Sequence, residues 1–286
     1  MGSTIQRILF PVDFSPSCEA MAPFVKRAAQ MCSARVTLLH VFDLTSSGFE
    51  LMERSLQEMK EDREHVARAR LNSFLAGDFP LDGCTRLLWI GDAATRIAEV
   101  AREGHFDLIV MPTHAGVFRR TLLGSTTAKI LNDADCPVMT TQHAETIAPR
   151  PLEHREWACA VSLQEDSERV LRFAKRMAED VHANLSIIHA IPAGDPGLQR
   201  QFDLDERVQS RERALARERI AELQRRVGFE GPVKVVIGSI KDALTGAARH
   251  LGADVLMIGR SPEAGVRLRD LTYAVVRDAP CPVVSI

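Results

Sequence analysis

Residues 107–125 read Asp-Leu-Ile-Val-Met-Pro-Thr-His-Ala-Gly-Val-Phe-Arg-Arg-Thr-Leu-Leu-Gly-Ser, and the fold can be worked out from this stretch. Its apolar run, Leu108 to Met111, is typical of a fully buried parallel strand. A short basic loop follows Pro112 and leads to Gly124-Ser125, directly before a helical pattern. Ligands bind at the carboxyl ends of parallel strands, and N–H groups at a helix N-terminus attract phosphate. The stretch therefore predicts a small-molecule site.

The remaining chain alternates strands and helices, and its order occurs twice. Strands are predicted at 7–12, 34–42, 85–90, 107–111 and 136–141, with a helix beginning at Ser15-Pro16 and another at 93–102. The strand at 34–42 matches 183–191, and the one at 136–141 matches 281–286, offsets of 149 and 145 residues. The chain is therefore a tandem repeat of one α/β domain with a parallel sheet and helices on both faces.

Stretch 107–125 resembles the phosphate-binding segment of the universal stress protein family. The nucleotide-binding members of that family read Gly-x-x-Gly, nine residues, then Gly-Ser or Gly-Thr. Here Pro112 and Ala115 stand at the two glycine positions, and the eight residues 116–123 precede Gly124-Ser125. Pro112 counts against binding because it has no N–H and fixes φ near about −65°.

The resemblance implies two Rossmann-like domains of the adenine nucleotide alpha hydrolase-like type. Each would hold a five-stranded parallel sheet of order 3-2-1-4-5. We expect domains at 1–143 and 156–286, joined by a linker at 144–155 that contains Pro149 and Pro151. In the family the fifth strands of two domains pair antiparallel, so the tandem chain would form an intramolecular pseudo-dimer, and a homodimer stays open.

The resemblance also supplies the candidate nucleotide site of domain 1. The residues beside the adenosine, in the loop and at the distal phosphates would be Pro11, Val12, Asp13, Val41, Met111, Thr113, His114, Gly116, Gly124, Ser125 and Thr126. Two simpler interpretations remain: Asp13 helps to cap a helix, and Gly124-Ser125 is a helix entry without a ligand. In domain 2, Ser162 replaces Asp13 and Arg269-Asp270 replaces the Gly-Ser pair, so we expect that site to be lost.

Composition narrows the function further. The chain has 286 residues, 45% hydrophobic and 26% charged, with a net charge of −2, which favours a soluble cytoplasmic protein without nucleic-acid or membrane partners. Its six cysteines form no Cys-x-x-Cys pair, so no metal site is expected. No Walker lysine, Gly-x-Ser-x-Gly or His-Glu-x-x-His motif is present, so we expect no catalytic residues and at most a slow ATPase.

Two functional hypotheses follow. In the first, ATP, with Mg²⁺, binds domain 1 as a non-catalytic switch that orders loop 112–123 and changes a surface read by an unknown protein partner. In the second, the protein binds no nucleotide and acts through dimerisation and protein partners. The charged segments 48–79 and 198–227 are predicted amphipathic helices; Val66 and Leu71 belong to the expected apolar stripe of the first, and Val208 and Leu215 to that of the second. Either segment could instead be a lid or a partner surface.

Overall fold

The computed structural model describes residues 3–42, 53–113, 123–142, 144–145, 147–192, 206–260 and 266–286, with the backbone alone at 53–60 and 266–270. It divides into two compact units. The first comprises Met1–Met139 with Ala144–Pro149, and the second Thr140–His143 with Arg150–Ile286. The exact domain boundaries given above stay a prediction.

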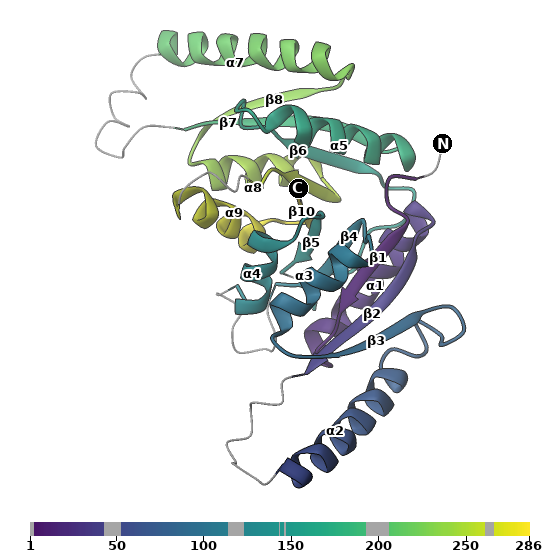
Figure 1. Cartoon of the computed structure of the whole chain (residues 1–286). Helices are drawn as coiled ribbons and strands as arrows, with labels where there is room; N and C mark the ends of the chain where they lie inside the picture. Colours follow the sequence, from purple (N-terminus) through teal and green to yellow (C-terminus); the bar gives the residue numbers. More distant parts are fainter. Residues whose placement is uncertain are drawn as a thin grey trace. The chain divides into compact units, whose positions relative to one another are not determined.

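The first half holds a five-stranded sheet of order β3-β2-β1-β4-β5 (Figure 1). Strand β1 lies parallel to both β2 and β4, and β2 lies parallel to β3. The elements are β1 (Arg7–Pro11), α1 (Pro16–Cys32), β2 (Arg35–Phe42), α2 (Glu53–Ser73), β3 (Thr85–Ile90), α3 (Ala93–Glu103), β4 (Leu108–Pro112), α4 (Ser125–Asp133) and β5 (Val138–Thr141). The predicted strand order is confirmed in this half.

The second half repeats the topology with the order β10-β9-β6-β7-β8. Strand β6 is central and lies parallel to β7 and β9, as β1 does to β2 and β4. The elements are β6 (Glu156–Ala160), α5 (Ser167–Asp180), β7 (Asn184–Pro192), α7 (Glu206–Val227), β8 (Val233–Gly238), α8 (Ile240–Leu251), β9 (Val255–Ile258), α9 (Val266–Asp278) and β10 (Val283–Ser285). Two tandem Rossmann-like domains, as predicted, therefore make up the chain.

The two halves also share unusual backbone conformations at matching turns. Phe14 and Leu163 follow the first strand of each half, and both adopt a φ of 62°. Ser33 and His182 follow the first helix of each half, and both adopt a φ of 54°. A left-handed conformation is uncommon outside glycine, so its recurrence shows that both halves keep one chain path where side chains differ.

The central strands form the core because both of their faces are covered. Ile8, Leu9 and Phe10 of β1 are fully buried, and every residue of β4 is buried. Such strands need continuous apolar runs rather than alternation. Helix α1 begins as predicted, with Ser15 as the N-cap accepting a hydrogen bond from the Cys18 N–H and with Pro16 in its first turn.

The two long helices, α2 and α7, bury fewer apolar side chains than the spacing of those residues in the sequence predicts. Leu71 of α2 is buried as expected, but Val66 is 64% exposed. Helix α7 buries Ile220 and Leu223, whereas Val208 and Leu215 are 38% and 43% exposed. The apolar stripe was therefore wrong at these three positions.

Both parts of the predicted linker are attached to the unit in which they are grouped. Ser17 of α1 donates a hydrogen bond to Glu145 Oε1 over 2.8 Å. Arg150 Nη1 donates to the Gly252 carbonyl, and His154 Nδ1 lies 2.7 Å from Asp254 Oδ1. These contacts attach Glu145 to the first unit and Arg150 and His154 to the second, and the bounds of the linker stay a prediction.

Candidate nucleotide-binding site

Asp13 lies at the carboxyl end of β1, after the buried residues Pro11 and Val12. Its carboxylate is exposed, and Oδ1 accepts hydrogen bonds from the Ser15 N–H at 2.9 Å and the Cys18 thiol at 3.0 Å. The helix cap itself is Ser15. Asp13 thus fixes the turn before α1, and a ligand that approached this edge of the sheet would still meet its exposed carboxylate.

Cys18 is the thiol nearest to this carboxylate, and it is not a nucleophile. Burial, with the adjacent Asp13 charge as the next cause, raises the pKa of Cys18 to about 12. The thiol is therefore protonated at neutral pH and serves as a donor to Asp13.

An aromatic cluster lies beside the end of β1. The Phe14 ring is 4.1 Å from the His40 ring and 5.2 Å from the Phe74 ring, and the Arg70 guanidinium lies 4.6 Å from the Phe14 centroid. The sequence alone gave no indication of a role for Phe14, Arg70 or Phe74. No local pattern could have done so, because Arg70 lies in the last turn of α2 and Phe74 directly follows that helix, and both reach Phe14 only through tertiary packing.

His40 belongs to this cluster as a neutral, hydrogen-bonded side chain. Its Nδ1 lies 2.7 Å from the Val12 carbonyl, which can only accept, so Nδ1 carries the proton. Burial is the main cause that lowers the pKa of His40, and Arg70 lowers it further, against the raising effects of the Val12 carbonyl and Asp13. His189 repeats the contact at 2.8 Å from the Val161 carbonyl, so both histidines are explained by packing.

Val41 follows His40 on β2 and is half-buried opposite Trp89 of β3. Successive strand residues point to opposite faces, so Val41 lies on the face away from His40. Because β1 pairs with both β2 and β4, Asp13, Val41 and the end of β4 share one edge of the sheet.

The end of β4 and the start of α4 are hydrogen-bonded to each other. The Gly124 N–H donates to the Thr113 carbonyl over 2.8 Å, and Thr127 Oγ1 donates to the Pro112 carbonyl over 3.0 Å. Met111 and Thr113 are buried, and Thr113 Oγ1 has no hydrogen-bond partner among the described residues. His114, Gly116 and the arginines 119 and 120 lie outside the described residues, so their predicted roles stay predictions.

Helix α4 begins without a side-chain cap. Its N-cap is Gly124, with φ −62° and ψ 143° and no side-chain hydrogen bond, and exposed Ser125 and half-buried Thr126 follow. Any residue can adopt this backbone conformation, so the glycine is not required by it. What glycine provides is the missing Cβ, which leaves the N–H groups of the first turn open to an anion.

Domain 2 differs at the matching place. Ser162 donates to Asp166 Oδ1 over 3.2 Å, and a Cβ on Gly259 would lie 2.6 Å from Asp166 Oδ2. The Asp166 carboxylate therefore lies close to the backbone just after β9. A negative charge at that point repels phosphate. The side chain of Asp270 lies outside the described residues, so the predicted loss of the domain 2 site stays a prediction.

The described residues hold no group of three His, Cys, Asp or Glu side chains that could bind a metal ion. None of the described helices combines the length and apolar character needed to cross a membrane.

Comparison with known proteins agrees with this architecture. The model of the universal stress protein family matches the chain twice, at residues 4–142 and 158–286. The chain therefore belongs to the universal stress protein family, as a member with two tandem domains.

Solved structures share the fold along the whole chain. A universal stress protein from Archaeoglobus fulgidus DSM 4304 is 20% identical, with a TM-score of 0.68, over 99% of this chain and 96% of that one. A functionally unknown protein from Pseudomonas aeruginosa PAO1 is 17% identical, with a TM-score of 0.62, over 99% and 92%. None of the curated proteins compared with the chain matches it.

Proposed function

We propose that domain 1 binds ATP as a non-catalytic switch in a cytoplasmic stress-response protein. The observation that carries the proposal is the junction of β4 and α4, where an uncapped helix N-terminus follows a loop whose ends are joined by the Thr113–Gly124 hydrogen bond. A buried hydroxyl without a described partner, Thr113 Oγ1, lies at the same junction. An anion with several acceptor oxygens would satisfy both kinds of donor.

The residues present fit a nucleotide along the edge of the sheet. The N–H groups after Gly124 and the hydroxyls of Ser125 and Thr126 would hold the phosphates, and the exposed Asp13 carboxylate would accept a ribose hydroxyl. Val12 and Val41 would offer the base an apolar surface. A bound triphosphate would bring Mg²⁺, held mainly by phosphate oxygens and water.

The switch would act through the loop between β4 and α4. A ligand shifts a conformational equilibrium only by its differential affinity for the two states, so bound ATP would have to favour one conformation of the loop. A protein partner would then read the loop surface. Cys18, Cys84, Cys159 and Cys281 are buried free thiols, which supports a reducing compartment such as the cytoplasm.

A rival function is an interaction protein that binds no nucleotide. Pro112 favours it, because this residue offers no N–H and its carbonyl already accepts the Thr127 hydroxyl. In that case the open end of α4 is simply a solvated helix start.

One experiment separates the two functions. Freshly purified protein is denatured and assayed for released nucleotide, and the emptied protein is titrated with ATP by calorimetry. Gly124→Asp, which places a carboxylate at the phosphate position, should abolish binding with the fold intact. Asp270→Ser in domain 2 is the control and should bind as the wild type does. Absence of released nucleotide and of heat at millimolar ATP would reject the switch in favour of the interaction protein.

A further inference from the structure

Helix α7 carries a palindrome that packing in its own domain does not explain. Residues 211–219 read Arg-Glu-Arg-Ala-Leu-Ala-Arg-Glu-Arg, the same in both directions, with Leu215 at the centre. The helix buries Ala216, Ile220, Leu223 and Val227 in its domain. Leu215 is 43% exposed, and Val208, two turns before it, is 38% exposed. A face with two exposed apolar side chains is thus left uncovered.

Charged residues flank Leu215 symmetrically. At about 100° per residue, Arg211 and Glu218 lie about 40–60° to one side of Leu215, and Glu212 and Arg219 lie about 40–60° to the other. Arg211, Glu218 and Arg219 are exposed and Glu212 is half-buried, and none of the four has an ion-pair partner among the described residues. The ion pairs described for this helix instead join Arg226 to Glu222 and Glu168, near its C-terminus.

We propose that α7 pairs antiparallel with α7 of a second copy of this chain, about a two-fold axis at Leu215. In that arrangement Leu215 contacts Leu215 of the second copy, and each residue before Leu215 lies level with the residue equally far after Leu215 in the second copy. The two copies of any residue lie on the same side of the helix contact.

This symmetry makes the charges complementary. On one side, Arg211 lies within one residue step of Glu218 of the second copy. On the other, Glu212 lies within one step of Arg219 of the second copy. The two-fold axis repeats each pair, so four opposite-charge pairs surround a central leucine contact, the usual arrangement of apolar seam and flanking charge in paired helices.

A parallel pair is less favourable for two reasons. It would place Glu222 opposite its own copy, and like charges repel. It would also bring both α5 helices to the same end of the pair, since α5 contacts α7 at Arg226 through Glu168. The antiparallel pair avoids both conflicts.

The test is the association state of the full chain, measured by sedimentation velocity across concentration at low and high salt. Arg211→Glu with Arg219→Glu gives an all-acidic face, and Glu212→Arg with Glu218→Arg an all-basic one. Each variant alone should weaken self-association by about tenfold or more, and mixing the two should restore it. The control is Arg213→Glu with Arg217→Glu. It makes the same change in charge, but these two residues lie about 160° around the helix from Leu215, so this variant should associate as the wild type does.

Circular dichroism of each variant checks that the fold is intact. The proposal fails if the wild type stays monomeric at hundreds of micromolar, if its association persists unchanged in the all-acidic variant, or if the mixture does not associate. Orientation is tested with a thiol-reactive cross-linker. Leu215→Cys should cross-link to its own copy, whereas Val208→Cys should not, because its two copies would be about 21 Å apart along the axis. Equal self-cross-linking at both positions would overturn the antiparallel arrangement.

Discussion

Arg86 of β3 connects the end of α2 to the sheet. Its guanidinium donates to the carbonyls of Leu71, Phe74 and Phe79, of which the last two are 2.8 and 2.7 Å away. A cation is favourable at a helix C-terminus, where carbonyls lack helical partners. Because Phe74 contacts Phe14 and so reaches the end of β1, Arg86 also positions the aromatic cluster beside the candidate site.

We expect Arg86→Lys to lower the free energy of unfolding by about 1–2 kcal/mol. A lysine keeps the charge, but its single ammonium group does not reproduce the planar fork that reaches three carbonyls. Urea denaturation measures the change. Arg102→Lys, at an exposed position of α3, is the control and should stay within about 0.5 kcal/mol of the wild type. Equal effects of the two substitutions would show that Arg86 does not hold α2.

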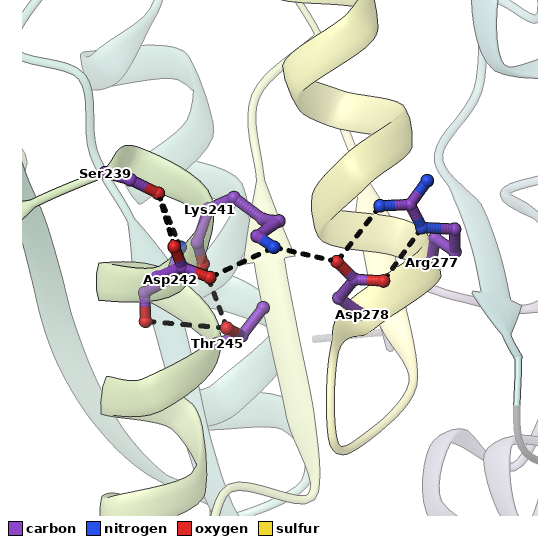
Figure 2. A network of polar contacts seen from close by, with 6 residues as sticks. All are labelled: Ser239, Lys241, Asp242, Thr245, Arg277 and Asp278. Carbon is purple, nitrogen blue, oxygen red and sulfur yellow. Dashed lines mark hydrogen bonds and ion pairs between the residues drawn. The ribbon is translucent and has the colours of Figure 1, made fainter. Parts of the chain in front are cut away.

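At the scale of elements, an ion pair joins the last two helices of each domain, with the charges reversed. In domain 1, Lys129 of α4 lies 3.5 Å from Asp92, the N-cap of α3. In domain 2, Lys241 of α8 lies 3.1 Å from Asp278 of α9, which Arg277 also binds at 2.8 Å (Figure 2). The repeat has thus kept the connection between the helices while exchanging which helix carries the cation.

Asp278 should make stability depend on pH. The hydrogen bond from Arg277 is the largest cause that lowers the pKa of Asp278 to about 2, and Lys241 lowers it as well. Its stabilising contribution is therefore complete above the ordinary carboxyl pKa of about 3.9 and is lost as the pH falls through about 2. With a side chain 32% exposed, the contribution should stay below about 1 kcal/mol.

The variant Asp278→Asn isolates this contribution. At pH 6 it should be less stable than the wild type, and the difference should close between pH 4 and pH 2 as the wild-type carboxylate becomes protonated. Chemical denaturation at several pH values gives the comparison. A difference that stays constant down to pH 2 would contradict the assignment to Asp278.

At the scale of the whole molecule, the two domains share a topology but differ at the strand edge where a ligand would bind. Domain 1 presents an uncapped α4, and domain 2 places the Asp166 carboxylate against Gly259. Two domains with the same fold therefore need not share a ligand site, because the side chains at the strand ends decide whether a ligand can bind.

We accordingly expect a calorimetric ATP titration of the emptied protein to saturate at about one nucleotide per chain, not two. Asp166→Ser removes the carboxylate from domain 2 without touching domain 1. It should leave the affinity of the domain 1 site unchanged. Saturation at two nucleotides in the wild type would show that the Asp166 carboxylate does not exclude phosphate.

Much of the fold was predictable because the residues that form buried strands and helix caps are close together in the sequence. The apolar run 108–111 predicted β4, and Ser15-Pro16 predicted the start of α1, since strand burial and helix capping each depend on a few neighbouring residues. The candidate site was predictable only in part. Gly124 and Thr113 proved to be hydrogen-bonded neighbours, but His114 and Gly116 lie outside the described residues.

The sequence by itself determined the strands, the first helix and the tandem repeat, and its resemblance to the universal stress protein family implied the strand order of each sheet. Only the tertiary structure decided what each surface position contacts. It brought Arg70 of α2 and Phe74, which directly follows that helix, to Phe14. It also left Val208 and Leu215 of α7 exposed despite their helical spacing. Periodicity says which side chains share a face of a helix, but whether that face is covered depends on elements that are distant along the chain.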